Sequence, residues 1–334
     1  MLLEAKLPIT LALSGAAAYG ATPWVVRLAK SVNFYDLPAG GYKDHARPTP
    51  YLGGLAVLIG FFLVVPLAGG DRRAVPLVAG MAALCIIGTV DDRRGVSWLA
   101  RVGIEAGAAV ALWRLDLGWH TGAGDLADVV VTVGWLVLIV NAFNIFDNMD
   151  GVAAAMAGVV AAGATALGIV DDDLWLAAAA AALCGACLGF LPHNLASPAR
   201  IFLGDGGSMA VGFAMAVLVM GSLGKAENQW PSFGLGLLLI GVPTVDCALR
   251  VIARRRTKVS FLTGGRDGLA HWWKRRLGSA RAVAGVLTTL QVAGSTLAVF
   301  AVAHGFDASL IVLIVFAVVA VAAMAFLDVR EVSG

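Results

Sequence analysis

Three polar side chains recur at a fixed spacing in an otherwise apolar segment near the middle of the chain. Asn141, Asn144 and Asp147 lie three residues apart, and their neighbours are Val, Ala, Phe and Ile. Residues three apart share one face of a helix, so these three form a polar stripe at a helix end. A polar stripe on an apolar helix faces either a functional site or a polar neighbour, and we favour the site.

Two further elements carry carboxylates next to apolar runs. Asp91 and Asp92 end one run, where they either terminate a helix or contribute to a site. The turn Gly204–Ser208 opens another run, and its glycines would let backbone amides approach a phosphate at a helix N-terminus. Asp205 in this turn could hold Mg²⁺ against that phosphate, although such a turn can also simply cap a helix. It is not a Walker loop, because the GK[ST] element is absent.

Basic residues and a histidine are concentrated in the last polar segment, which includes Arg254–Lys258, Arg266 and His271. Alone, the basic cluster would contact lipid headgroups, and Trp272 and Trp273 would lie at the membrane interface. Together with the carboxylates and amides of the other segments, the basic cluster forms a set of groups that suits a different role. Carboxylates that hold Mg²⁺ and cations that clamp a diphosphate are the parts of phosphoryl transfer. The residues predict that chemistry without choosing a substrate.

The composition indicates that these polar segments are positioned by membrane-spanning helices. The chain is 59% hydrophobic and 14% charged, with a mean hydropathy of +0.85, whereas a soluble domain is about half apolar and a quarter charged. We therefore predict an all-α, polytopic transmembrane helix bundle. Eleven runs are long enough to span a bilayer: 7–28, 51–69, 74–90, 98–115, 128–145, 151–170, 174–192, 207–223, 231–252, 282–304 and 308–327.

Two of these runs need comment. The run 98–115 is the weakest, because Arg101, Glu105 and Arg114 interrupt it. The run 7–28 is longer than the apolar region of a signal peptide, so we interpret it as a span.

The four cysteines all lie within apolar runs, and we interpret them as small packing residues rather than as a metal or redox site.

The basic residues set the expected orientation. With the N-terminus outside and the C-terminus in the cytoplasm, all but five of the 24 Lys and Arg residues face the cytoplasm. The five exceptions are Lys6, Arg72, Arg73, Arg114 and Lys225. We therefore expect one integral membrane domain, 1–334, with cytoplasmic site loops near 36–54, 91–97, 141–151, 193–208 and 253–281. The net charge of +2 gives no reason to expect a nucleic-acid partner.

Four motifs follow one another in these loops. They comprise Asp36, Pro38, Lys43, His45, Pro48, Thr49, Pro50, Gly53 and Gly54, then Asp91 and Asp92, then Asn141, Asn144, Asp147, Asp150 and Gly151, and finally Phe202, Gly204, Asp205, Gly207 and Ser208. In their order and spacing they resemble the polyprenyl-phosphate N-acetylhexosamine-1-phosphate transferases, glycosyltransferase family 4. The resemblance runs from Asp36 to about Val283 and includes the expected eleven spans.

The resemblance implies a reaction and its partners. A sugar-1-phosphate, with GlcNAc-1-phosphate as the first choice, would pass from a UDP-sugar to undecaprenyl or another polyprenyl phosphate and release UMP. The reaction would depend on Mg²⁺, with Mn²⁺ as an alternative, and would start a cell-envelope glycopolymer. The enzyme would lie in the bilayer of a bacterial inner membrane, with a cytoplasmic active site, and it would form a homodimer.

The resemblance also implies roles for individual residues. Asp91, Asp92 and Asp205 would be catalytic, with Asp205 and Asp92 at the metal and Asp91 on the side of the lipid phosphate. A covalent aspartyl-phosphate route stays open. The substrate-binding set would be Lys43, His45, Asn141, Asn144, Asp147, Asp150, Arg266 and His271.

The chain departs from the family pattern at three positions. Gly95 replaces a third acid, Asn148 replaces a glycine, and Gly268 stands where related sequences often carry His. The triple-His block of the peptidoglycan branch is absent, which argues against UDP-MurNAc-pentapeptide, while UDP-GalNAc stays open.

Other functional classes fit the sequence less well. A transporter would need charges deep in several spans, and Asp246 is the one acid placed in that way. A CDP-alcohol phosphotransferase would need an Arg shortly after Asp150-Gly151, where Val-Ala-Ala-Ala-Met-Ala stands instead. An inactive isoprenoid-binding scaffold would have lost the acidic residues that this chain keeps.

Overall fold

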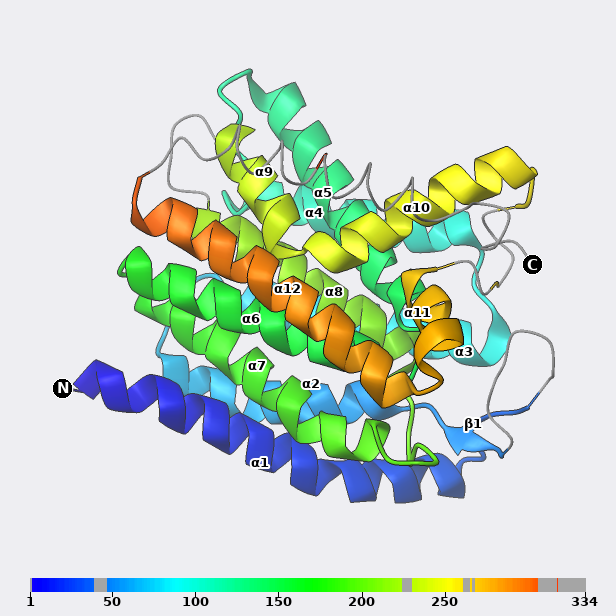
Figure 1. The fold of residues 1–334 in the computed structure, drawn as a ribbon. Coiled ribbons are helices and arrows are strands. Elements are labelled where there is room, and N and C mark those ends of the chain that lie inside the picture. The colour runs from blue at the N-terminus through cyan, green and yellow to red at the C-terminus, as the bar shows by residue number, and fades with distance from the viewer. Residues whose placement is uncertain are drawn as a thin grey trace.

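The computed structural model describes residues 2–38, 47–223, 230–260, 265, 268–305 and 317, and it is a bundle of helices (Figure 1). The predicted all-α class is confirmed. The helices are α1 (Leu2–Ser31), α2 (Gly53–Val64), the 3₁₀ turn η1 (Val65–Ala68), α3 (Ala74–Arg94), α4 (Trp98–Arg114), α5 (Asp125–Phe146), α6 (Val152–Val170), α7 (Leu174–Asn194), α8 (Gly204–Leu223), α9 (Trp230–Leu239), α10 (Gly241–Thr257), α11 (Leu269–Leu277) and α12 (Ala280–Ala303). Strands β1 (Tyr35–Asp36) and β2 (Thr49–Pro50) pair antiparallel beside the bundle.

Seven of the described helices are long and apolar enough to cross a membrane, and the bent pair formed by α9 and α10 would make an eighth. A helix covers each of the first ten runs that the sequence predicts as spans, although α2 with η1 and α4 are shorter. The eleventh run, 308–327, lies outside the described residues apart from Ala317. The count of eleven and the orientation therefore stay predictions.

The run 231–252, which the sequence predicts as one span, is bent in the structure, because α9 and α10 meet at 88°. Pro243 has no N–H to donate to the carbonyl of Leu239, so one helical hydrogen bond is missing at this point. Gln291 of α12 replaces the missing bonds. Its Nε2 donates to the Leu239 carbonyl at 2.7 Å, and its Oε1 accepts from the Val242 N–H at 2.9 Å. The break is thus stabilised by a side chain from another helix.

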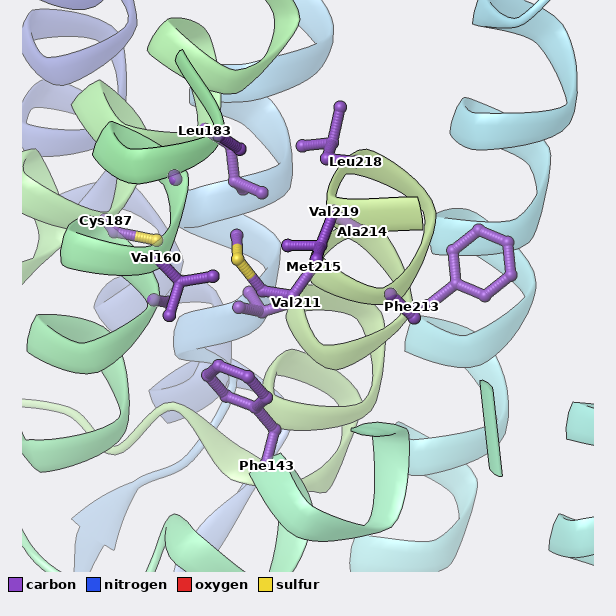
Figure 2. Packing of buried hydrophobic residues seen from close by; sticks show 14 of the residues in the cluster. Phe143, Val160, Leu183, Cys187, Val211, Phe213, Ala214, Met215, Leu218 and Val219 are labelled. Atoms are coloured by element: carbon purple, nitrogen blue, oxygen red, sulfur yellow. The ribbon is translucent and has the colours of Figure 1, made fainter. Parts of the chain in front are cut away.

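The centre of the bundle is formed by α6, α7 and α8 (Figure 2). Side chains such as Val160, Leu183 and Met215 are completely buried there, where they interdigitate between the three helices. The cysteines of α7 behave as the sequence predicts: Cys187 lies in this apolar contact, and both Cys184 and Cys187 are unpaired thiols. α8 runs through this core, so its N-terminus is held rigidly.

Backbone contacts between glycines fix the start of α8 against α2 and α3. The N–H groups of Gly53 and Gly54 donate to the carbonyls of Phe202 and Leu203, both at 2.9 Å. A Cβ atom on Gly54 would overlap the backbone at Gly207, and one on Gly88 would overlap the backbone of Asp205. Only glycine permits these approaches. They bring the end of α3, which carries Asp92, against the start of α8, which carries Asp205.

Candidate active site

One end of the bundle holds a cavity of about 500 Å³. Its walls come from segments that are far apart in the sequence, because β1, α3, α8, α11 and the turn after α5 all end or begin there (Figure 1). Five of the predicted site residues line it: Asp92, Asp147, Asp150, Asp205 and His271. The other lining residues are Asp36, Tyr51, Asn148, Met149, Asn194, Phe202, Leu203, Gly204, Gly265, Lys274 and Ala280.

The two acids at the centre of the cavity are joined through the backbone of α8. Oδ2 of Asp92 accepts a hydrogen bond from the backbone N–H of Asp205 at 3.0 Å. A carboxylate at this place complements the positive end of the helix dipole. The Tyr51 hydroxyl donates to the backbone carbonyl of Asp92 at 2.8 Å, which fixes the end of α3 from the other side. Gly204 precedes the pair with a φ of +77°, a conformation that favours glycine.

Arg101 of α4 is a residue of this site that the sequence analysis missed. Its Nη1 bonds to Oδ2 of Asp91 at 2.6 Å and lies 3.7 Å from Oδ2 of Asp205. Its Nη2 donates to Oδ1 of Asn144 at 2.7 Å. In the sequence, Arg101 and Glu105 were interpreted only as charges that interrupt a span. Arg101 and Glu105 are four residues apart and share one face of α4, and Asn141 and Asn144 are three residues apart and share one face of α5. These two polar faces were the signal that could have paired the helices.

Asp91 and Asp92 have different surroundings. Oδ1 of Asp91 accepts the backbone N–H of Val96 at 2.5 Å, and its Oδ2 is occupied by Arg101. Asp91 is not among the residues that line the cavity, whereas Asp92 is. Asp91 thus contacts both Arg101 and the side chain of Asp205.

The polar stripe on α5 divides into two parts. Asn144 donates to Oδ1 of Asp205 at 2.9 Å and to the hydroxyl of Ser208 at 3.1 Å, so it holds the start of α8. Asn141 lies one turn deeper, where its amide donates to Oε2 of the fully buried Glu105 at 2.5 Å. Both interpretations of a polar stripe thus apply here: Asn144 faces the site and Asn141 faces a polar neighbour.

Asp147 is the residue at which α5 ends. It lies within electrostatic range of Asp205 and Asp150, and it accepts a hydrogen bond from the backbone N–H of Gly204. The pKa of Asp147 is raised to about 8, first by burial and then by the two neighbouring negative charges, while that hydrogen bond acts in the opposite direction. A cation in the cavity would relieve this repulsion.

The last wall comes from α11, which presents His271 and Lys274 to the cavity from one helix face. His271 was predicted from the sequence, whereas Lys274 was counted only as one of the cytoplasmic basic residues. Three other predicted residues, Lys43, His45 and Arg266, lie outside the described residues.

The donor chemistry of the cavity fits Mg²⁺. Asp92, Asp147 and Asp205 present hard oxygen donors and lie within electrostatic range of one another. Within the described ranges, no three Asp, Glu, His or Cys side chains are arranged as a complete metal site. Mg²⁺ commonly takes only one or two carboxylates and completes its shell with water and substrate phosphates, so this incompleteness agrees with the metal.

Comparisons with known proteins identify the family of the chain. Residues 74–222, which run from α3 to α8, match the model of glycosyl transferase family 4. The decaprenyl-phosphate N-acetylglucosaminephosphotransferase of Mycolicibacterium smegmatis is 31% identical, over 78% of this chain and 74% of the relative. A probable undecaprenyl-phosphate N-acetylglucosaminyl 1-phosphate transferase of Bacillus subtilis is 27% identical, over 75% and 72%.

A second kind of relative is also found. A phospho-N-acetylmuramoyl-pentapeptide-transferase of Frankia alni is 30% identical, over 66% of this chain and 75% of the relative. Enzymes of this family generally depend on a divalent metal ion. The family match, these relatives and the apolar helices lead to one conclusion: the chain belongs to glycosyl transferase family 4 and is a multi-pass membrane sugar-phosphate transferase.

Proposed function

We propose that this enzyme transfers GlcNAc-1-phosphate from UDP-GlcNAc to a polyprenyl phosphate. An oxygen of the lipid phosphate attacks the β-phosphorus of the UDP-sugar, and the bond from that phosphorus to the bridging oxygen breaks. The products are polyprenyl-diphosphate-GlcNAc and UMP. The observation that carries the proposal is the pair Asp92 and Asp205, joined at the N-terminus of α8 and open to the cavity. The names of the Mycolicibacterium and Bacillus relatives support GlcNAc as the sugar.

Asp205 and Asp92 would hold the Mg²⁺ ion, or Mn²⁺ in its place. When bound, the metal would neutralise the diphosphate charge and so lower the barrier to attack. Asn144 and Arg101 fix the orientation of the Asp205 carboxylate, which makes the site ready before substrate arrives. Asp91 acts through Arg101, so Asp92 is the acid of the pair that meets metal or phosphate.

The remaining predicted residues would bind the nucleotide sugar. Asp147 and Asp150 line the cavity beside the turn after α5, where they can meet the uridine or its diphosphate, and His271 and Lys274 face them from α11. Lys43, His45 and Arg266 would bring positive charge to the phosphates, and Asn141 would support Asn144 from the next turn of α5. The lipid phosphate would enter from the bilayer.

The test is a transfer assay in detergent. Purified protein receives undecaprenyl phosphate, Mg²⁺ and radiolabelled UDP-GlcNAc, and lipid-extractable label and UMP are measured. We expect both products from the wild type, and neither with EDTA or from Asp205→Ala. Asp128→Asn is a matched control, because Asp128 is a buried acid of α5 that binds Thr121 at the other end of the helix. It should keep its activity.

The sugar is tested in the same assay. UDP-GalNAc and UDP-MurNAc-pentapeptide replace UDP-GlcNAc, the latter because of the Frankia relative. Labelled lipid from one of them alone would keep the reaction and correct the sugar. A folded protein that makes labelled lipid from none of the three would overturn the proposal.

A further inference from the structure

The helix α11 needs an anchor if it is to present His271 and Lys274 to the cavity. It has only nine residues, and a helix of that length is not stable by itself in water. Its C-terminal end is continuous with α12 through Gly278 and Ser279. Its N-terminal end begins after Gly268, and a contact with another part of the molecule is needed to fix that end.

Asp246 of α10 holds the N-terminal end. Its Oδ1 accepts the backbone N–H of Leu269, the first residue of α11, at 2.5 Å. That N–H has no partner within the helix, and a carboxylate there also complements the helix dipole. Oδ2 of Asp246 accepts from Nε of Arg250 at 2.8 Å. The side chains of Asp246 and Arg250 are 1% and 7% exposed, so the pair is buried.

Gly268 completes this arrangement. A Cβ atom at position 268 would overlap the guanidinium group of Arg250. A side chain here would therefore require the Arg250 guanidinium to shift, which would disturb its hydrogen bond to Asp246. The three residues Asp246, Arg250 and Gly268 act as one unit, which we name the α11 anchor.

We propose that Asp246 is a positioning residue, which sets His271 and Lys274 against the substrate through the α11 anchor. Asp246 does not itself line the cavity. The one acid that would have suited a transporter thus has a role in the transfer reaction. The kinetic test of this inference rests on the proposed function, whereas the second test depends on the structure alone.

The kinetic test is a double-mutant cycle. We expect Asp246→Ala to lower kcat/KM by about 10- to 100-fold, since a displacement of about 1 Å can cost that much. Because Asp246 acts through α11, the same change in a His271→Ala background should cost less than about threefold. Asp246→Asn keeps an acceptor for the Leu269 N–H and should recover part of the loss. Full, additive losses in the double variant would overturn the proposal.

The second test does not need activity. Amide hydrogen exchange in peptides covering 269–277 should be faster in Asp246→Ala than in the wild type, and unchanged in Asp128→Asn. If Asp246→Ala does not fold, Asp246→Asn is measured in its place, and a smaller increase is expected. Unchanged exchange in α11 would overturn the anchor. Faster exchange in a protein whose wild type transfers no sugar would overturn the proposed function and leave the anchor supported.

Discussion

Arg101 joins two functional groups that the sequence shows only as separate motifs. Its guanidinium binds Asp91 and Asn144 and lies beside Asp205. We expect Arg101→Ala to lower kcat/KM by about 100- to 1,000-fold, as the loss of an electrostatic donor in a preorganised site does. Arg101→Lys should recover little, because an ammonium group cannot bridge several planar acceptors.

The control for this prediction lies on the same helix. Arg114→Ala removes an exposed arginine at the opposite end of α4 and should leave kcat/KM within about twofold of the wild type. Equal losses in Arg101→Ala and Arg114→Ala would show a general effect on α4 rather than a role at the site.

Asp147 gives the protein a pH-dependent stability. Its folded pKa is raised to about 8, so the folded state binds its proton more tightly than the unfolded state does. The resulting stability is full below about pH 4 and is lost as the pH rises toward 8. In EDTA, the melting temperature of the wild type should therefore fall from pH 5 to pH 9 more steeply than that of Asp147→Asn. Asp125→Asn, at an exposed position of α5, should behave as the wild type; parallel slopes for all three proteins would contradict the prediction.

Residue spacing predicted part of the cavity and missed another part. Asp92, Asp147, Asp205 and His271 stood out because each lies in a short polar run beside an apolar one, whereas Asp150 was named only through the resemblance to the family. Arg101 and Lys274 were missed for a different reason. Their charges were explained by topology alone, and the matching spacings on α4 and α5 were not compared with each other.

At the scale of elements, the break between α9 and α10 depends on Gln291. Gln291→Leu would leave the Val242 N–H without its partner, and the Leu239 carbonyl with only the long 3.5 Å hydrogen bond from the Ser295 hydroxyl. An unsatisfied buried group costs about 1–3 kcal/mol, so the melting temperature in detergent should fall clearly. Thr289→Ala, an exposed position two residues earlier, is the control and should change it little. An unchanged melting temperature in Gln291→Leu would mean that Pro243 alone maintains the bend.

The break between α9 and α10 also shows a limit of predicting helices from the sequence. Hydropathy alone gave one span across 231–252, because both arms are apolar enough to satisfy it. Pro243 was visible in that run, but many membrane helices tolerate proline when neighbours satisfy the freed backbone groups. The neighbour here comes from 49 residues later in the chain, and no local pattern connects the two.

At the scale of the whole molecule, the orientation follows from where charge gathers. The cavity and α11 lie at the end of the bundle away from the N-terminus of α1 (Figure 1). We propose that this end faces the cytoplasm of a bacterial cell, in accordance with the distribution of Lys and Arg. Sealed inside-out membrane vesicles should then use added UDP-GlcNAc without detergent, and right-side-out vesicles should not. Activity in right-side-out vesicles alone would reverse the orientation.

The fold class was predictable because composition decides it: a chain this apolar must satisfy its backbone within helices. The arrangement of those helices was not predictable, because it depends on close contacts between single atoms. The approach of Gly54 to Gly207 is an example. Glycines in apolar runs are common, and only the three-dimensional structure shows which of them touch.

The pairing of Gly53 and Gly54 with Phe202 and Leu203 has a consequence for the order of synthesis. A ribosome adds about 5–20 residues per second, so the start of α2 is made roughly 7–30 s before its partner. During that interval five further helices, α3 to α7, leave the ribosome while these two amides still lack their carbonyls. The catalytic end of the nascent protein is therefore assembled only when α8 arrives. Chains released before that point should be recognised by membrane quality control as incomplete.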